Sequence, residues 1–438
     1  MDTGTVTATD DTPGSMTGTT RPAGLGRGGS FVFLVPLILA GLSMLGPFSI
    51  DTPYPAFREM ATDFAVTSDE MQLVVSAYLI SFGLMSPFHG PLSDAIGRRK
   101  VIIGGVVVYV AASVGCALST DLETLLAFRV LQGLSAGGGV IVSRTVIRDV
   151  YSGPEAQRLM SRVMMIFAIA PAIAPVIGGL LLQLGPWPVT FWFMAGLGLL
   201  LILVVAVALP ETHPVENRIP LRLGSLVRSL TAVSRNATFH RVAWAAALSF
   251  AGQFIYIGAA PIFVVDLLGR GELDFWIFFV PMIGGVLVGS QLSSLAAGRI
   301  SGNVLITSAL AFGALGALSN VLLAVVAGPA LPWAVVGPAL IAVGTAAAYP
   351  SMQLALLDMF PGSRGAAVSM FTFFTLLLNG LIAGAVAPLV TDTVVELALA
   401  STVLVVAGLG SWWWHLAVER RDVTTTPSPH PIAPTDQT

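Results

Sequence analysis

Gly90-Pro91-Leu92-Ser93-Asp94-Ala95-Ile96-Gly97-Arg98-Arg99-Lys100 is a short charged segment between two long apolar stretches. An acid, a glycine turn and three consecutive cations enter the hydrocarbon of a membrane only at high cost, whereas the flanking stretches do so readily. We therefore expect the segment to join two membrane-spanning helices. Its cations place it on the cytoplasmic face, because cytoplasmic loops carry an excess of Lys and Arg.

The composition extends this expectation to the whole chain. Of 438 residues, 55% are hydrophobic and only 10% are charged, against about 25% charged residues in soluble domains. Such a chain has too little polar surface to be soluble. The net charge of -3 gives no case for nucleic-acid binding, and the single cysteine, Cys116, excludes an internal disulfide and a metal cluster built on cysteine. We expect no metal site.

Twelve apolar stretches approach the roughly 20 residues that a spanning helix needs. They lie near 31–55, 71–90, 101–119, 122–143, 162–183, 188–209, 242–265, 275–297, 303–327, 332–357, 365–389 and 394–417. Backbone groups in lipid must be satisfied within each segment, and no short alternating strands of a barrel are visible. The sequence therefore predicts an all-α membrane protein with twelve transmembrane helices.

The distribution of cations supports this count and sets the orientation. Eighteen of the 21 cations fall on one side of the predicted membrane, leaving Arg58 and Arg270 on the other side and Arg129 within a span. The eighteen are Arg21, Arg27, Arg98, Arg99, Lys100, Arg144, Arg148, Arg158, Arg162, Arg218, Arg222, Arg228, Arg235, Arg241, Arg299, Arg364, Arg420 and Arg421. By the positive-inside rule, both termini are cytoplasmic in a multi-pass protein of the cell membrane.

The longest loop divides the chain into two halves of six spans. We predict a disordered cytoplasmic N-tail (1–30), an N-terminal half (31–209), a cytoplasmic linker (210–241), a C-terminal half (242–417) and a disordered cytoplasmic C-tail (418–438). The linker is either a short amphipathic helix on the membrane surface or a solvated connection.

The two halves share residues in equivalent loops. Ser93–Arg98 is similar to Ser294–Arg299, and Asp149–Gly153 is similar to Asp358–Gly362, although Leu295 replaces the acid of Asp94. Duplicated halves place a substrate site at their interface, near the middle of the bilayer.

Arg129 lies about seven residues inside the fourth predicted span. A central arginine costs roughly 2.5–3.5 kcal/mol on insertion scales, so it is a candidate functional residue by default. The alternative is an arginine whose long side chain reaches the outer interface.

Asp51, near the end of the first span, is the acid expected deepest in the membrane. Burial raises the pKa of a carboxyl group and a nearby arginine lowers it. A carboxyl under both influences can bind and release a proton near neutral pH. Its alternative is a helix-end acid in the extracellular headgroup zone.

Uncharged polar side chains within the spans are the candidates for lining a cavity. Each is also consistent with a simple helix–helix hydrogen bond. The candidates are Tyr78, Gln132, Gln253, Tyr256 and Asn379, of which Gln253 and Tyr256 share one face of the seventh span.

Several motifs together resemble the major facilitator superfamily. Gly90, Asp94, Gly97, Arg98 and Arg99 stand in the positions of its motif A. Arg129–Gly133 resembles motif B of its drug:proton antiporters. Pro171, Pro175, Gly178 and Gly179 match motif C, the antiporter signature, and Asp51–Ala56 and Pro210–Thr212 fit the same group. The resemblance covers about residues 30–417 and is strongest to the Bcr/CflA branch of multidrug efflux proteins, which includes chloramphenicol exporters.

The resemblance implies an antiporter, not an enzyme, that exports small amphipathic drugs or antibiotics in exchange for protons. It also implies two pseudo-symmetric six-helix halves in a bacterial cytoplasmic membrane. The proton gradient would be the energy source, with no cofactor; the partners would be a small-molecule substrate, protons and the bilayer, and we expect a monomer.

In the mechanism we expect, protonation of Asp51, sensed near Arg129, selects the side to which the cavity opens, and Asp94 takes part in a cytoplasmic gate. The related alternative is a proton symporter or uptake carrier on the same fold, which motif C disfavours. The alternative from another class is an intramembrane hydrolase that uses Ser135. Its Gly133–Gly137 segment matches GxSxG, but lies inside a predicted helix rather than on a strand–turn–helix elbow.

Overall fold

The computed structural model describes residues 29–151, 153–360 and 363–425. These ranges contain helices and turns and no strand. The predicted tails fall largely outside them, together with Arg21 and Arg27. Helix α14 nevertheless continues to Thr425, beyond the predicted start of the C-tail at residue 418.

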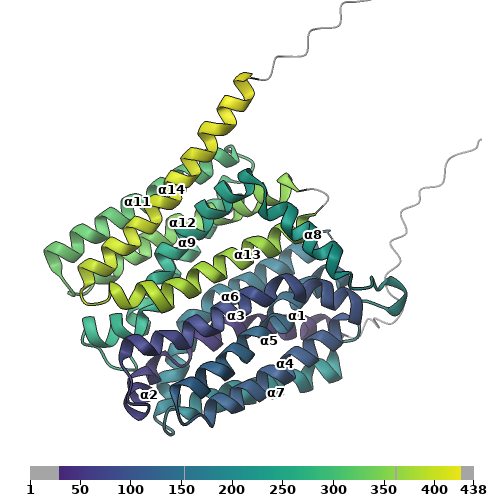
Figure 1. Ribbon diagram of the computed structural model, residues 1–438, viewed down its shortest axis with the longest axis horizontal. Helices are drawn as coiled ribbons and strands as arrows, with labels where there is room; N and C mark the ends of the chain where they lie inside the picture. Colours follow the sequence, from purple (N-terminus) through teal and green to yellow (C-terminus); the bar gives the residue numbers. More distant parts are fainter. Residues whose placement is uncertain (1–28, 152, 361–362, 426–438) are drawn as a thin grey trace, which may run out of the picture.

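Twelve long helices of the described ranges form two groups of six that lie side by side (Figure 1). The first group is α1 (Gly29–Asp51), α3 (Ser68–Ile96), α4 (Arg98–Ala117), α5 (Leu122–Val150), α6 (Gly153–Leu182) and α7 (Pro188–Ala208). The second is α9 (Ala237–Gly258), α10 (Trp276–Ala296), α11 (Gly302–Ala327), α12 (Trp333–Met359), α13 (Arg364–Leu381) and α14 (Val394–Thr425). The predicted twelve-helix, all-α fold is confirmed.

Short elements complete the helices at the end of the bundle that carries α2, opposite α8 (Figure 1). They are η1 (Tyr54–Ala56) and α2 (Phe57–Asp63) after α1, η3 (Ile262–Leu267) after α9, and η4 (Ile382–Val386) and η5 (Ala387–Leu389) after α13. The linker contains η2 (Val215–Asn217) and α8 (Leu223–Ser234), so it is helical in part. Val233 of α8 is buried, whereas Val227 is exposed.

Several helices exceed their predicted spans because local capping, not the apolar stretch, sets their ends. Thr67 and Glu70 form a capping box at the start of α3, in which the Thr67 backbone N–H donates to the Glu70 carboxylate at 2.8 Å. Asp121 caps α5 by accepting from the Thr124 backbone N–H at 2.8 Å, and this hydrogen bond lowers the pKa of Asp121. Gly97, at φ +110°, separates α3 from α4.

Ten helical stretches of the described residues are long and apolar enough to cross a membrane, and α6 contains a shorter apolar stretch, Ile169–Leu182. The two halves meet where α3 packs against α13 and α6 against α10. At the first contact, the Ser76 hydroxyl donates to the Gly380 carbonyl at 2.6 Å. The interface therefore brings together segments about 300 residues apart in sequence.

Candidate functional site

Among the residues whose burial the structure describes, Arg129 is the most deeply buried cation of the N-terminal half, at 0% exposed. Its Nε donates to the Val74 carbonyl at 3.0 Å, and its Nη1 donates to the Ser49 carbonyl at 2.8 Å and to Gln132 Oε1 at 2.5 Å. The guanidinium carbon also lies 4.7 Å from the centre of the Tyr78 ring, a cation–π distance. Arg129 thus joins α1, α3 and α5, and does not extend toward the membrane surface.

A chain of polar side chains holds these partners in place. The Gln132 amide nitrogen donates to the Ser113 hydroxyl of α4 at 2.8 Å, which fixes the amide oxygen toward Arg129. On the other side, the Ser49 and Tyr109 hydroxyls lie 2.7 Å apart. Gln132 and Tyr78 therefore lie in one cluster with Arg129.

Asp51 is the last residue of α1 and is only 2% exposed. Among the described residues, its Oδ1 has no hydrogen-bond partner and no ion pair joins it to Arg129. The hydroxyls of Tyr54 and Tyr78 lie within electrostatic range of both Asp51 and Arg129. The Tyr54 hydroxyl has no hydrogen-bond partner among the described residues. The two charged residues thus belong to one buried polar region, linked through tyrosines rather than by direct contact.

This region contains buried polar atoms without hydrogen-bond partners both beside Arg129 and beside Asp51. Arg129 Nη2 and Thr52 Oγ1 are buried without partners among the described residues. A buried polar atom without a partner costs about 1–3 kcal/mol, so such a cluster is poised to exchange partners. A proton on Asp51 would add a donor among these groups.

The expected motif A gate forms a compact ionic network at the other end of the helices. Arg98, 5% exposed, donates through Nε to Asp149 Oδ2 at 2.9 Å and pairs through Nη1 with Asp94 Oδ1 at 2.5 Å. Its backbone N–H donates to Glu211 Oε1 at 2.9 Å. Arg99 donates to the carbonyl of Ala206. The loop thereby ties the ends of α3, α5 and α7 to the start of α4.

Two partners in this network, Asp149 and Glu211, are not among the site residues that the sequence predicts. Asp149 appears in the sequence only as part of a repeat, and Glu211 only as part of the segment after the sixth span. Their shared signal is an acid at the cytoplasmic end of a span, close to the Arg98 loop in the predicted topology.

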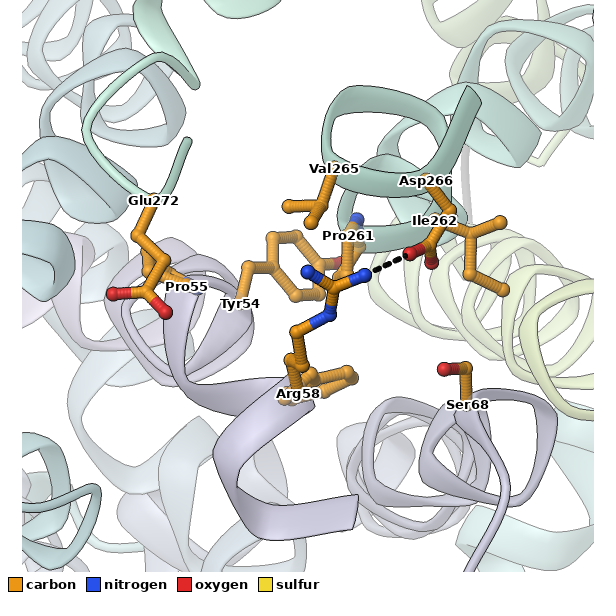
Figure 2. Close-up of a pocket in the computed structure, with 10 residues that line it drawn as sticks. Tyr54, Pro55, Arg58, Ser68, Pro261, Ile262, Val265, Asp266 and Glu272 are labelled. Carbon is orange, nitrogen blue, oxygen red and sulfur yellow. Dashed lines mark hydrogen bonds and ion pairs between the residues drawn. The ribbon is translucent and has the colours of Figure 1, made fainter. Parts of the chain in front are cut away.

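At the opposite end, the two halves are joined beside Asp51. Arg58 Nη2 of α2 lies 3.0 Å from Asp266 Oδ1 of η3, and Figure 2 shows the guanidinium reaching across to that carboxylate. Tyr54 and Pro55 from the first half, and Pro261 and Ile262 from the second, line a small pocket around this pair (Figure 2). The ion pair thus bridges the two halves at this end of the bundle.

The motif C residues of α6 make close contacts at the same end. Pro171 and Pro175 lie inside α6. A Cβ placed on Gly178 would lie 2.1 Å from the Thr52 carbonyl oxygen, and one on Gly179 would lie 2.6 Å from the Glu272 carbonyl oxygen. The two glycines thus let α6 approach the backbone beside Asp51 and a loop of the second half.

We expect Gly178→Ala to lower the thermal unfolding temperature of the purified protein. The methyl group would overlap a backbone oxygen that cannot rotate away, and overpacking of this kind costs about 1–3 kcal/mol. Gly185→Ala is the matched control, because a Cβ there meets nothing within 4 Å. Equal unfolding temperatures for the two variants would contradict the close approach of α6.

The remaining cavity candidates lie in the second half. Gln253 and Tyr256 are buried in α9, and the Tyr256 hydroxyl accepts from Asn320 Nδ2 at 2.7 Å. Asn379 of α13 is 1% exposed, and its Oδ1 is unpartnered within the described chain. It adjoins Gly380, which accepts from Ser76 of α3. The structure does not bring these three residues into the Arg129 cluster.

The structure places another cation, Arg144, within the long apolar helix α5, where the sequence predicts a loop. Helix α5 continues to Val150, and the Arg144 guanidinium carbon lies 5.4 Å from the centre of the Phe167 ring. Hydrophobicity alone ends the span near residue 143, because the apolar stretch stops there while the helix does not.

Ser135 is inside α5, where its hydroxyl donates to the Gln132 carbonyl at 2.9 Å. His89 is the nearby imidazole, and its Nδ1 lies 3.0 Å from the Met85 carbonyl. Both groups are therefore engaged with the backbone of their own helices. The structure provides no nucleophile elbow at Ser135. Within the described ranges, no group of three or more His, Cys, Asp or Glu residues is placed to hold a metal ion.

Two six-helix groups, a buried charged cluster between helices and an ionic loop at one end define a polytopic membrane transporter. Residues 37–388 match the family described as the Major Facilitator Superfamily. The chain belongs to this superfamily and is a transporter rather than an enzyme.

Relatives and a solved structure are consistent with this assignment. The chain is 36% identical over 244 residues to the uncharacterized MFS-type transporter YdgK of Bacillus subtilis (strain 168), covering 55% of this chain and 61% of that protein. It is 32% identical over 284 residues to the bicyclomycin resistance protein homolog of Haemophilus influenzae, covering 64% and 70%. A crystal structure of a D-xylose-proton symporter superposes with a TM-score of 0.69 at 16% identity, covering 87% of this chain and 98% of the symporter. That likeness concerns the fold alone.

Proposed function

We propose that this protein is a proton-coupled antiporter that exports small amphipathic drugs or antibiotics across the bacterial cytoplasmic membrane. The observation that supports this proposal most directly is the buried region in which Asp51 and Arg129 share neighbours but do not form an ion pair. The Haemophilus relative is named for bicyclomycin resistance, which supports a drug-like substrate. We place both termini in the cytoplasm, as the distribution of cations favours, and expect a working monomer.

In the proposed cycle, Asp51 carries the proton. The two ends of the bundle act as the outer and the inner gate. A proton from outside neutralises Asp51 and removes an unpartnered buried charge, which changes the relative stability of the two arrangements of the halves. The Arg58–Asp266 pair closes the outer end, and the Arg98 network belongs to the inner end. Release of the proton inside, followed by substrate loading, returns the protein to the outward arrangement.

The energy available is sufficient for export. One proton entering down about 100 mV gains about 2.3 kcal/mol, and one unit of pH difference adds about 1.4 kcal/mol. At one-to-one exchange, the sum sustains a gradient of a few hundredfold for a neutral substrate, since 1.4 kcal/mol is a factor of ten.

Susceptibility of an efflux-deficient bacterial host tests the substrate class. We expect the wild-type chain to raise the inhibitory concentration of at least one amphipathic antibiotic in a panel that includes chloramphenicol, bicyclomycin and cationic dyes. A dissipated proton gradient should abolish that difference. No protection against any compound, with the protein present in the membrane, would contradict drug export.

The second candidate function is a proton symporter or uptake carrier on the same fold. It differs from the antiporter in the direction of proton flow relative to substrate. The tight contact of Gly178 with Thr52, beside Asp51, favours the antiporter because it is formed by the motif C segment.

A further inference from the structure

A groove of about 310 Å³ lies outside the proposed transport site, on the flank of the N-terminal half. It is formed where α3 and α4 diverge over α5, because each packs far more extensively on α5 than on the other. Met85, His89, Leu92 and Ile96 supply one wall, while Leu134, Ser135 and Gly138 of α5 lie at its floor. The lining is largely apolar.

The groove opens away from the second half of the protein. On α3, Ser76, Ile80 and Gly83 contact α13 and η4. At 3.6 residues per turn, the groove-lining residues of α3 lie about half a turn from that face. Ile96, Val108 and Leu134 at the groove are 36–43% exposed. In a membrane, an exposed apolar face of this kind is turned toward lipid.

A single cation stands at the end of the groove. Lys100, the only lysine of the chain, is an exposed lining residue in the first turn of α4. None of the ion pairs among the described residues includes Lys100, and the neighbouring Asp94 is paired with Arg98. Arg99 is also engaged, at the Ala206 carbonyl. Lys100 is thus available to an anion at the depth where the cytoplasmic headgroups lie.

We infer that this groove binds one acyl chain of an anionic phospholipid from the cytoplasmic leaflet, with the phosphate of the headgroup at Lys100. An apolar trough that ends in an uncompensated cation is complementary to a molecule with an acyl chain and an anionic head. The space beside Gly104 is open to the acyl chain, since a Cβ placed on this glycine would meet no atom within 4 Å. The inference depends on insertion in a membrane and not on the identity of the exported compound.

Native mass spectrometry of the full-length protein in detergent tests the site, with phosphatidylglycerol and phosphatidylcholine of identical chains as probes. We expect tighter binding of phosphatidylglycerol. Lys100→Gln should weaken that binding about fivefold, the factor equivalent to about 1 kcal/mol per basic residue at an anionic surface, and Lys100→Arg should retain it. Gly104→Leu, which fills the groove, should weaken binding of both lipids. Glycerol 3-phosphate, which has the head without chains, should not compete.

Matched controls separate the site from general charge and packing. Arg299→Gln removes a cation from the equivalent loop of the second half, and Gly196→Leu adds a side chain at another helix position where a Cβ meets nothing within 4 Å. Neither should change lipid binding. The inference is overturned if Lys100→Gln and Gly104→Leu bind phosphatidylglycerol like the wild type while remaining folded, if the controls weaken it equally, or if glycerol 3-phosphate displaces it.

Discussion

We expect replacement of Arg129 with lysine to abolish pH-driven export while the protein still reaches the membrane. The guanidinium spans three acceptors on α1, α3 and α5, and a single ammonium cannot reproduce that planar geometry. Charge-assisted hydrogen bonds contribute about 1.5–3 kcal/mol each. Losing even one in the transport-competent arrangement lowers its population at least about tenfold.

The measurement is the initial rate of substrate export from everted vesicles after an imposed pH step, normalised to protein. Arg270→Lys is the control, because Arg270 is an exposed cation in the turn after η3. A further variant, Arg129→Gln, should also lower the unfolding temperature, since it leaves the Val74 and Ser49 carbonyls without their donor. A wild-type export rate in Arg129→Lys would show that the charge alone, and not its geometry, is required.

We expect Asp51→Asn to have a similarly large effect on pH-driven export. This variant separates substrate movement from proton coupling. The amide has nearly the shape of the carboxyl but cannot exchange a proton, so export driven by pH should fall to background. Substrate counterflow, which needs no net proton movement, should persist. We expect the variant to be at least as stable as the wild type, because it removes an acid whose Oδ1 is buried without a hydrogen-bond partner.

Two comparisons keep this prediction specific. Asp51→Glu keeps an exchangeable proton and should retain part of the coupled export, whereas Asp392→Asn changes an exposed acid outside the region and should behave as the wild type. If Asp51→Asn loses counterflow and coupled export together, Asp51 has a structural role rather than a proton-carrying one.

Hydrophobicity and charge predict the number and order of the helices well, because the bilayer imposes both. They predict helix ends poorly. α5 continues past residue 143 through Arg144 to Val150, and α3 continues to Ile96, where the positive φ of the following Gly97 interrupts the helix. Past the hydrocarbon boundary, capping and tertiary contacts control where a helix stops, and neither is encoded in an apolar count.

The sequence identifies two charged residues of the candidate site, but it does not predict which side chains they contact. An arginine and an acid within predicted spans are conspicuous in a sequence, and both are buried in the structure. That they share Tyr54 and Tyr78 as neighbours instead of forming a pair depends on the rotation of α1 and α3 against α5. Gln253 and Tyr256 illustrate the same limit, since Tyr256 is hydrogen-bonded to Asn320 on another helix.

The most direct test of proton antiport at Asp51 is the pH inside proteoliposomes when substrate is added outside, in the absence of any imposed gradient. The substrate is the compound that the susceptibility panel identifies, and its entry is followed in parallel by radiolabel. The wild type should make the lumen alkaline as substrate enters, and Asp51→Asn should take up substrate without a change in pH. Acidification by the wild type, or equal alkalinisation by Asp51→Asn, would contradict the account.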